Sequence, residues 1–175
     1  MNRAELRRFL FVVAPFAFVL AAVALVASLA LDMETDEGTG GPANGDHWHA
    51  RYVFVVCDVV QPEAPFWEAG VHTHGDGIIH IHPFTSAEAG RGARLVKWFE
   101  YGGGFLTDDE VRLPGDDASY GNGDECRDGS EGLVQVFVTP AATGVEEELE
   151  DWEDYIPQDG DLVVLYFGRD LDPED

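Results

Sequence analysis

The chain has 175 residues, of which 34 are acidic and 10 are basic, and its formal net charge at pH 7 is −24. A surface this negative repels the phosphates of nucleic acids and of anionic lipid headgroups, so the sequence excludes nucleic acid as a partner and argues against peripheral docking on lipid. It attracts cations, although solubility alone also explains such acidity.

The first predicted element is a transmembrane helix over residues 9–31, a run without a charged side chain. At about 1.5 Å of rise per residue, a helix of this length crosses roughly 30 Å of hydrocarbon. Arginines precede the run in residues 1–8 and acidic residues follow it, so the positive-inside rule predicts a single-pass protein of the cell membrane with a cytoplasmic N-terminus and an extracytoplasmic C-terminal domain. A cleaved secretory signal, with a small-residue site at 28–30, is the alternative, but the apolar region of a signal is usually shorter.

The rest of the chain is predicted to contain a linker, one domain and a short tail. Residues 32–45 have almost no large apolar side chains and are expected to be flexible. Residues 46–170 have the pattern of one compact domain, and 171–175 form an acidic tail. An extracytoplasmic location predicts a disulfide between Cys57 and Cys126, with two separate thiols as the alternative.

Residues 46–170 predict an α+β fold with a mixed sheet, one main helix and one short helix. Strands are expected where β-branched and aromatic side chains cluster, and helices where a capping box precedes apolar residues at helical spacing. The capping boxes are Thr85 with Glu88 for the main helix and Thr143 with Glu146 for the short one. The predicted strands are 52–57, the two strands of a hairpin within 71–84, 133–138 and 162–167.

The order of these elements resembles the β-grasp, or ubiquitin-like, fold. The closing segment, Gln158-Asp-Gly-Asp-Leu-Val-Val-Leu165, resembles the end of β-grasp sulfur carriers. Those proteins need a C-terminal Gly-Gly, whereas this chain ends in Pro173-Glu-Asp175. The resemblance therefore implies the fold and not the sulfur-carrier activity.

The strongest functional signal is the pattern of histidines. All six occur as His-x-His, which a random scatter would rarely produce. In a strand, residues i and i+2 share a face about 6.5 to 7 Å apart, so two imidazoles can converge on one metal ion. The candidate metal ligands are His47, His49, His72, His74, His80 and His82, together with Asp76.

The loop of the predicted hairpin decides whether its histidines share a face, because directly opposed residues point to the same side of a sheet. A three-residue loop at 75–77, with Gly77 in the left-handed conformation, opposes His72 to His80 and puts all four hairpin histidines on one face. A two-residue turn opposes His72 to Ile81, and the two pairs then point to opposite faces. Only the three-residue loop places the four hairpin histidines where they can form a metal site.

The residue types indicate which metal is expected. Neutral imidazoles suit Zn(II) and Cu(II), whereas Cu(I) prefers thioether or thiolate ligands. Asp46 and Asp76 are close to the histidines in sequence and are candidate carboxylate ligands, or partners that orient the ligands. The sequence thus predicts a membrane-tethered protein that captures, buffers or presents Zn(II) or Cu(II), with an envelope or membrane protein as candidate partner.

The same residues are also compatible with two other functions. The histidines can be the structural or pH-responsive face of a non-catalytic envelope interaction module. The chain can also be a small metal-dependent hydrolase, with Asp46 or Asp76 as general base beside an open coordination position. The run from His72 to Gly77 resembles the His-x-His-x-Asp-His motif of metallo-β-lactamase-fold hydrolases, but it has glycine at the last position. Converging rings favour metal binding, and splayed rings favour the interaction module.

Four segments carry a resemblance to a known group of proteins. They are His47-Trp-His-Ala50, Cys57, the segment from His72 to Phe84, and Asn122-Gly-Asp-x-Cys126. Together they are similar to a group of uncharacterised, membrane-anchored proteins of high-GC Gram-positive bacteria. The resemblance implies a shared histidine site and no particular activity.

Overall fold

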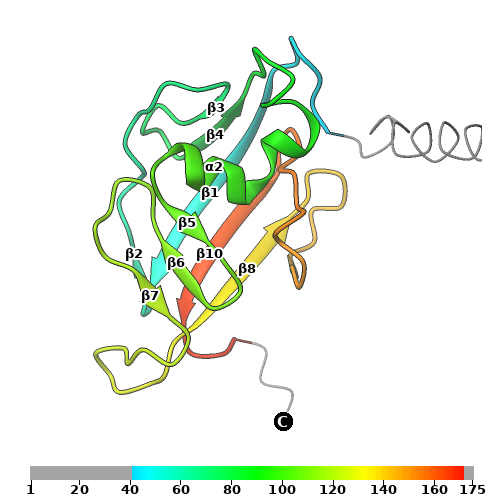
Figure 1. The fold of residues 1–175 in the computed structure, drawn as a ribbon. Coiled ribbons are helices and arrows are strands. Elements are labelled where there is room, and N and C mark those ends of the chain that lie inside the picture. The colour runs from blue at the N-terminus through cyan, green and yellow to red at the C-terminus, as the bar shows by residue number, and fades with distance from the viewer. Residues whose placement is uncertain (1–40, 172–175) are drawn as a thin grey trace, which may run out of the picture. The chain divides into compact units, whose positions relative to one another are not determined.

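Residues 41–171 are described by the computed structural model. They form an α+β domain in which a mixed β-sheet dominates, and the single α-helix of this part of the chain is α2 (Leu95–Tyr101) (Figure 1). The predicted transmembrane helix at 9–31 lies outside these residues, as does most of the predicted linker. Among residues 41–171, none of the helices combines the length and the apolar character needed to cross a membrane.

Two long strands, β1 (Trp48–Val56) and β10 (Leu162–Gly168), lie side by side at the centre of the main sheet and run parallel. The other strands are β2 (Val59–Val60), β3 (Val71–His72), β4 (Ile78–Ile81), β5 (Phe105–Leu106), β6 (Glu110–Arg112), β7 (Tyr120–Gly121), β8 (Leu133–Thr139) and β9 (Glu147–Glu148). The main sheet has the order β3-β4-β1-β10-β8-β9, with β2 also paired to β1, and its remaining pairings are antiparallel. Strands β5, β6 and β7 form a second, small sheet.

The core lies between the main sheet and α2, which crosses one face of that sheet (Figure 1). Alternate residues of β1, including Tyr52 and Phe54, are buried on this face. The Trp98 ring of α2 is fully buried, with its centroid 4.9 Å from that of Tyr52 and 6.0 Å from that of Phe54. Because successive strand residues point to opposite sides, His49 and Arg51 of β1 project from the face opposite α2.

The predicted disulfide between Cys57 and Cys126 is present and joins the end of β1 to the loop before β8. Cys57 and Asp58 form the tight turn between β1 and β2, and both have positive φ, 50° and 63°. Positive φ at both central residues is the geometry of a two-residue hairpin turn. The disulfide closes a loop of 69 residues, which in the chain-entropy account stabilises the domain by roughly 4 kcal/mol.

The predicted short second helix is wrong. The segment forms β9 (Glu147–Glu148), an edge strand paired with β8, followed by turns. A helix would have stacked carboxylates four residues apart, as at Glu146 and Glu150, where like charges repel. Trp152 and Ile156 nevertheless enter the core, from an irregular segment rather than from one face of a helix.

The main helix is present but begins later than predicted, at Leu95 rather than directly after the Thr85 capping box. The Glu88 carboxylate accepts hydrogen bonds from the backbone N–H of Gly70, before β3, and of Phe84, after β4. Glu88 therefore joins the two segments that flank the histidine hairpin instead of capping a helix.

Candidate metal centre

The hairpin of β3 and β4 has the register that gathers its histidines. His72 lies opposite His80, as the three-residue loop predicts. Gly75 and Gly77 have φ values of 75° and 73°, a left-handed conformation that glycine adopts without the steric cost of a Cβ. The predicted register is confirmed.

Strand β1 adds the remaining histidine pair to the same face. His49 lies opposite His80 in the antiparallel pairing of β1 with β4. The same register places His47 opposite His82, and their ring centroids are 4.0 Å apart. Sequence reasoning recognised this pair but did not align it with the hairpin, because no tight turn joins β1 to β4 and sets their register.

The other face of these strands anchors the site to the core. Val71, Ile79 and Ile81 alternate with the histidines and are fully buried. The Trp98 indole N–H of α2 donates to the His72 backbone carbonyl at 3.1 Å. The backbone under the imidazoles is thus fixed by apolar packing, as a preformed ligand site requires.

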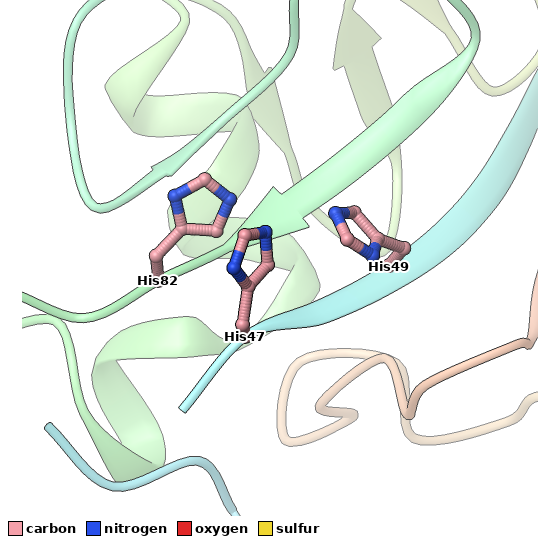
Figure 2. A group of neighbouring side chains, drawn as sticks. All are labelled: His47, His49 and His82. Atoms are coloured by element: carbon pink, nitrogen blue, oxygen red, sulfur yellow. The ribbon is translucent and has the colours of Figure 1, made fainter. Parts of the chain in front are cut away.

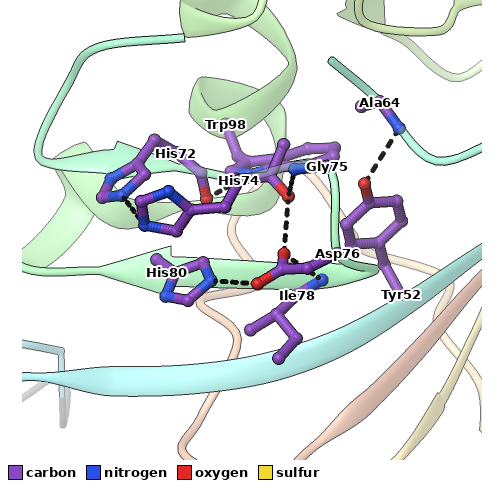
Figure 3. Close-up of polar contacts among 10 residues, drawn as sticks. Tyr52, Ala64, His72, His74, Gly75, Asp76, Ile78, His80 and Trp98 are labelled. Carbon is purple, nitrogen blue, oxygen red and sulfur yellow. Dashed lines mark hydrogen bonds and ion pairs between the residues drawn. The ribbon is translucent and has the colours of Figure 1, made fainter. Parts of the chain in front are cut away.

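The first group of convergent ligands, here called the hairpin triad, is His72, His74 and His80 (Figure 3). Their ligand nitrogens lie within 4.8 Å of one another. The Nε2 atoms of His72 and His74 are 3.2 Å apart, and His80 Nε2 is 3.0 Å from Oδ2 of Asp76. Four ligands at about 2.0 to 2.1 Å from a tetrahedral ion are roughly 3.3 Å apart. Both pairs therefore have nearly the spacing that one ion requires.

Asp76 is held toward the hairpin triad by its own loop. The Thr73 hydroxyl and the Ile78 backbone N–H donate to its Oδ1, each at 3.3 Å, while Oδ2 contacts His80 (Figure 3). Burial acts to raise the pKa of this carboxyl, but the hydrogen bond and charge of His80 and the Ile78 N–H together bring the pKa below its ordinary value. Asp76 is therefore an anion at neutral pH.

Asp46 is the predicted carboxylate that the structure does not bring to the histidines. Neither group of convergent ligands includes it, and its Oδ2 accepts a hydrogen bond from the Ala43 backbone N–H at 2.8 Å. Its proximity in sequence was a weak signal, because an aspartate in a turn before a strand commonly hydrogen-bonds its own backbone.

The second group, here called the β1 triad, is His47, His49 and His82, gathered where β1 begins and β4 has ended (Figure 2). The His47 ring centroid is 4.7 Å from that of His49 and 4.0 Å from that of His82. His47 is exposed, and the other two are half-buried. Nε2 of His82 is buried without a hydrogen-bond partner, a costly state for a polar atom that a bound ion would relieve.

The two triads touch. The ring centroid of His49 is 4.8 Å from that of His80, and the centroid of His72 is 4.8 Å from that of His82. Each contact joins one member of the β1 triad to one member of the hairpin triad. The six imidazoles, whose rings converge rather than splay, form one continuous histidine face on three neighbouring strands.

Burial and crowding keep three of the imidazoles, those of His49, His72 and His82, neutral. Burial, reinforced by the neighbouring His74 and His80, lowers the pKa of His72. Burial and four neighbouring histidines lower the pKa of His82 from 6.5 to about 4. Burial, His80 and His47 lower the pKa of His49 in the same way. At pH 7 each of these rings therefore keeps a lone pair available to a metal ion.

Two exposed phenylalanines flank the histidine face, and sequence reasoning missed them. Phe66 is 59% exposed, and its ring stacks on that of His74 with centroids 5.7 Å apart. Phe84 is 71% exposed, with its ring centroid 6.5 Å from that of His82. Their residue type gave no signal, because only the folded structure distinguishes an exposed phenylalanine from a core one.

No protein-family model, curated protein or solved structure significantly matches this chain. Function is therefore argued from the histidine face. Three imidazoles in each triad, with a carboxylate beside one member of the hairpin triad, are a donor set suited to a divalent transition metal.

Proposed function

We propose that this chain is a membrane-tethered, extracytoplasmic protein that binds Zn(II) or Cu(II) on its histidine face and captures, buffers or presents the ion. The observation that carries the proposal is the convergence of all six histidines into two triads, each with ligand nitrogens within 4.8 Å of one another. A polar face without a ligand has no need of such convergence, and it leaves Nε2 of His82 buried and unpartnered.

The donor atoms suit Zn(II) or Cu(II) and disfavour Cu(I). Imidazole nitrogen suits both metals, and the carboxylate of Asp76 adds a negative charge. Residues 41–171 supply no free soft ligand of the kind that Cu(I) prefers, because Cys57 and Cys126 are joined in a disulfide and both methionines, Met1 and Met33, precede residue 41. These ligands therefore favour a divalent ion, Zn(II) or Cu(II), over Cu(I).

The tether and the location rest on separate observations. The uncharged run 9–31 supports an anchor in the cell membrane with the domain outside. The Cys57–Cys126 disulfide supports an oxidising compartment, since cytosolic thiols are kept reduced. An extracytoplasmic domain of this kind meets metal ions before they enter the cell.

We also infer a β-grasp-like fold for the domain. The central pair β1 and β10 is parallel, the hairpin strand β4 lies beside β1, and β8 with β9 lies beside β10. The helix α2 falls between the hairpin and β8 in the chain. This order and these directions support the resemblance that the sequence carries, without supplying an activity.

Exposed aromatic side chains support presentation of the ion to a partner protein. Phe66 and Phe84 lie beside the hairpin triad and the β1 triad, respectively, on a chain whose formal net charge at pH 7 is −24. Aromatic anchors close to a charged rim are typical of protein interfaces. A metal-accepting protein of the cell envelope is the partner this surface fits.

The experiment is a metal titration of the full-length chain, purified in detergent without a polyhistidine tag. Zn(II) and Cu(II) are each titrated against a competing chelator, and we expect dissociation constants below about 1 μM. The double variant His47→Ala/His74→Ala removes the exposed histidine of each triad and should weaken binding at least a hundredfold while circular dichroism stays unchanged. Binding weaker than micromolar in the wild-type chain would overturn the proposal.

A further inference from the structure

We infer that the histidine face holds two metal ions of unequal affinity, a retained ion at the hairpin triad and an exchangeable ion at the β1 triad. The inference rests on the proposed metal binding and adds a division of roles between the two triads. Its consequence is a protein that stays loaded with one ion while it takes up and releases a second.

The number of ions follows from the geometry. Each triad contains three nitrogens within 4.8 Å of one another, and no histidine belongs to both groups. At metal–nitrogen distances of about 2.0 to 2.1 Å, one tetrahedral ion accepts only four ligands. Six imidazoles therefore exceed one such ion, and they divide into two sets of three without rearrangement of the strands.

An independent observation marks the β1 triad as a ligand site in its own right. Nε2 of His82 is buried and has no hydrogen-bond partner. The ring centroid of His82 is 4.0 Å from that of His47 and 6.2 Å from that of His49, the other members of its triad (Figure 2), and 4.8 Å from that of His72. An ion bound by the β1 triad would give this buried nitrogen a partner. An ion at the hairpin triad alone would leave it without one.

Charge distinguishes the two sites. Asp76 lies 3.0 Å from Nε2 of His80 and contributes a carboxylate to the hairpin triad. Beside the β1 triad, Asp159 Oδ1 accepts the backbone N–H of His49 at 2.8 Å, a contact with the main chain and not with an imidazole. Because a divalent ion is stabilised by an adjacent anion, the hairpin triad binds the first ion.

Exposure and mutual repulsion make the second ion exchangeable. Each triad has one exposed histidine, but the hairpin triad also contains a buried one, His72, which is 6% exposed, whereas the other two members of the β1 triad are half-buried. Two divalent ions held by touching triads repel each other, so occupation of the hairpin triad weakens binding at the β1 triad. The β1 triad therefore exchanges its ion with solvent or with a partner more readily.

The contacts between the triads provide a route for the ion. His49 and His80 are directly opposed on β1 and β4, with ring centroids 4.8 Å apart. An ion that moves from the β1 triad to an empty hairpin triad forms one metal–nitrogen bond and breaks another at each step. The ion stays divalent throughout, so no electron is transferred.

The chain offers a matched pair of variants for the test. His47 and His74 are the exposed members of their triads, so His47→Ala and His74→Ala remove one ligand each with little effect on the core. Full-length protein is titrated with Zn(II) against a chelator, and native mass spectrometry counts the bound ions. We expect two ions in the wild type, the second bound at least tenfold more weakly than the first.

The variants should then separate the two sites. His47→Ala should abolish the second ion and change the affinity of the first by less than threefold. His74→Ala should weaken the first ion at least tenfold. With Cu(II) as the probe, the paramagnetic resonance spectrum of the wild type should show an isolated ion at one equivalent and dipolar broadening at two, and His47→Ala should remain unbroadened.

Three outcomes would overturn the inference. A single ion lost equally in both variants would mean one shared site, which leaves the proposed metal binding intact. Two ions of equal affinity would contradict the division into retained and exchangeable sites. Failure of the wild type to bind either metal would overturn the inference and the proposed function together.

Discussion

Asp76 connects the hairpin loop to the histidine face through one side chain. Its Oδ1 accepts hydrogen bonds from Thr73 and Ile78, while its Oδ2 contacts Nε2 of His80. The first two contacts shape the loop and the third orients a ligand. Carboxylates that orient a metal-binding histidine commonly change metal affinity by 10- to 100-fold when they are removed.

The variant Asp76→Asn tests this role. The asparagine keeps an acceptor for Thr73 and Ile78 but loses the negative charge, so we expect Zn(II) to bind the hairpin triad about tenfold more weakly with little loss of stability. The measurement is chelator competition on the full-length chain. Asp117→Asn, at an exposed loop carboxylate that belongs to neither triad, is the control for net charge and should leave the affinity unchanged. Equal weakening in both variants would show that only the overall charge matters.

At the residue scale, the sequence predicts well which histidines converge, and it predicts their surroundings poorly. The six histidines and Asp76 are recognisable because their types and spacing are those of metal ligands. Asp46 has the same type and proximity, but a backbone hydrogen bond in its own turn holds it. Phe66 and Phe84 carry no local signal, since their exposure depends on segments distant in sequence.

Among the elements, the hairpin depends on its glycine loop. Gly77 has φ of 73°, and a Cβ added there would meet nothing closer than 3.8 Å, so the cost of Gly77→Ala is conformational rather than steric. We expect a loss of about 1 to 2 kcal/mol in the free energy of unfolding. Zn(II) binding should also weaken, because the loop sets the register that opposes His72 to His80.

Gly103 provides the matched control for that prediction. It has φ of 78° after α2, and a Cβ added there would meet nothing within 4 Å. Gly103→Ala should therefore cost similar stability in chemical denaturation and leave the Zn(II) affinity unchanged. If both variants weaken binding to the same extent, general destabilisation rather than hairpin register is the cause.

The elements differ in how far local sequence determines them. The register of the β3–β4 hairpin is predictable because its short loop contains the residues that decide it. The alignment of β1 with β4, which completes the histidine face, depends on packing across the domain. The predicted second helix is wrong although local signals favoured it. Its capping residues and apolar spacing were outweighed by the repulsion of crowded carboxylates.

On the scale of the whole domain, the disulfide stabilises the fold at a distance from the histidines. Cys57 follows the last residue of β1, whereas His49 lies near its start. The double variant Cys57→Ser/Cys126→Ser should lose about 4 kcal/mol of stability in denaturant titrations, because the unfolded chain regains the freedom of a 69-residue loop. Zn(II) affinity of the molecules that remain folded should be unchanged. A large loss of affinity at native conditions would mean that the disulfide shapes the site directly.

The mixed sheet with its helix and the disulfide were predictable because each depends on strong local patterns or on the cysteine count. The gathering of six histidines into two triads was not, because it combines a hairpin register with a long-range strand pairing. The proposed function rests on the second kind of information. A metal site built from three strands exists only when the whole domain is folded, which couples metal binding to stability.

That coupling has a pH dependence in the metal-free protein. The pKa values of His49, His72 and His82 are lowered in the folded chain, to about 4 for His82, whereas an unfolded histidine titrates near 6.5. Between these values the unfolded state binds more protons, so stability is complete above about pH 6.5 and falls as the pH decreases toward 4. Because the rings are partly solvated, we expect a total loss of about 2 kcal/mol.

Denaturant titrations of the metal-free, full-length chain at several pH values between 4 and 7 measure this loss. The variant His82→Gln removes the group with the largest lowering of pKa and should flatten the decrease, while the lowered pKa values of Asp76 and Glu88 affect stability only below about pH 4.5. Saturation with Zn(II) at pH 7 should add stability in proportion to the logarithm of the free metal concentration, because the ion binds only the folded face. A decrease that is equally steep in His82→Gln would assign the acid sensitivity to the carboxylates instead of the histidine face.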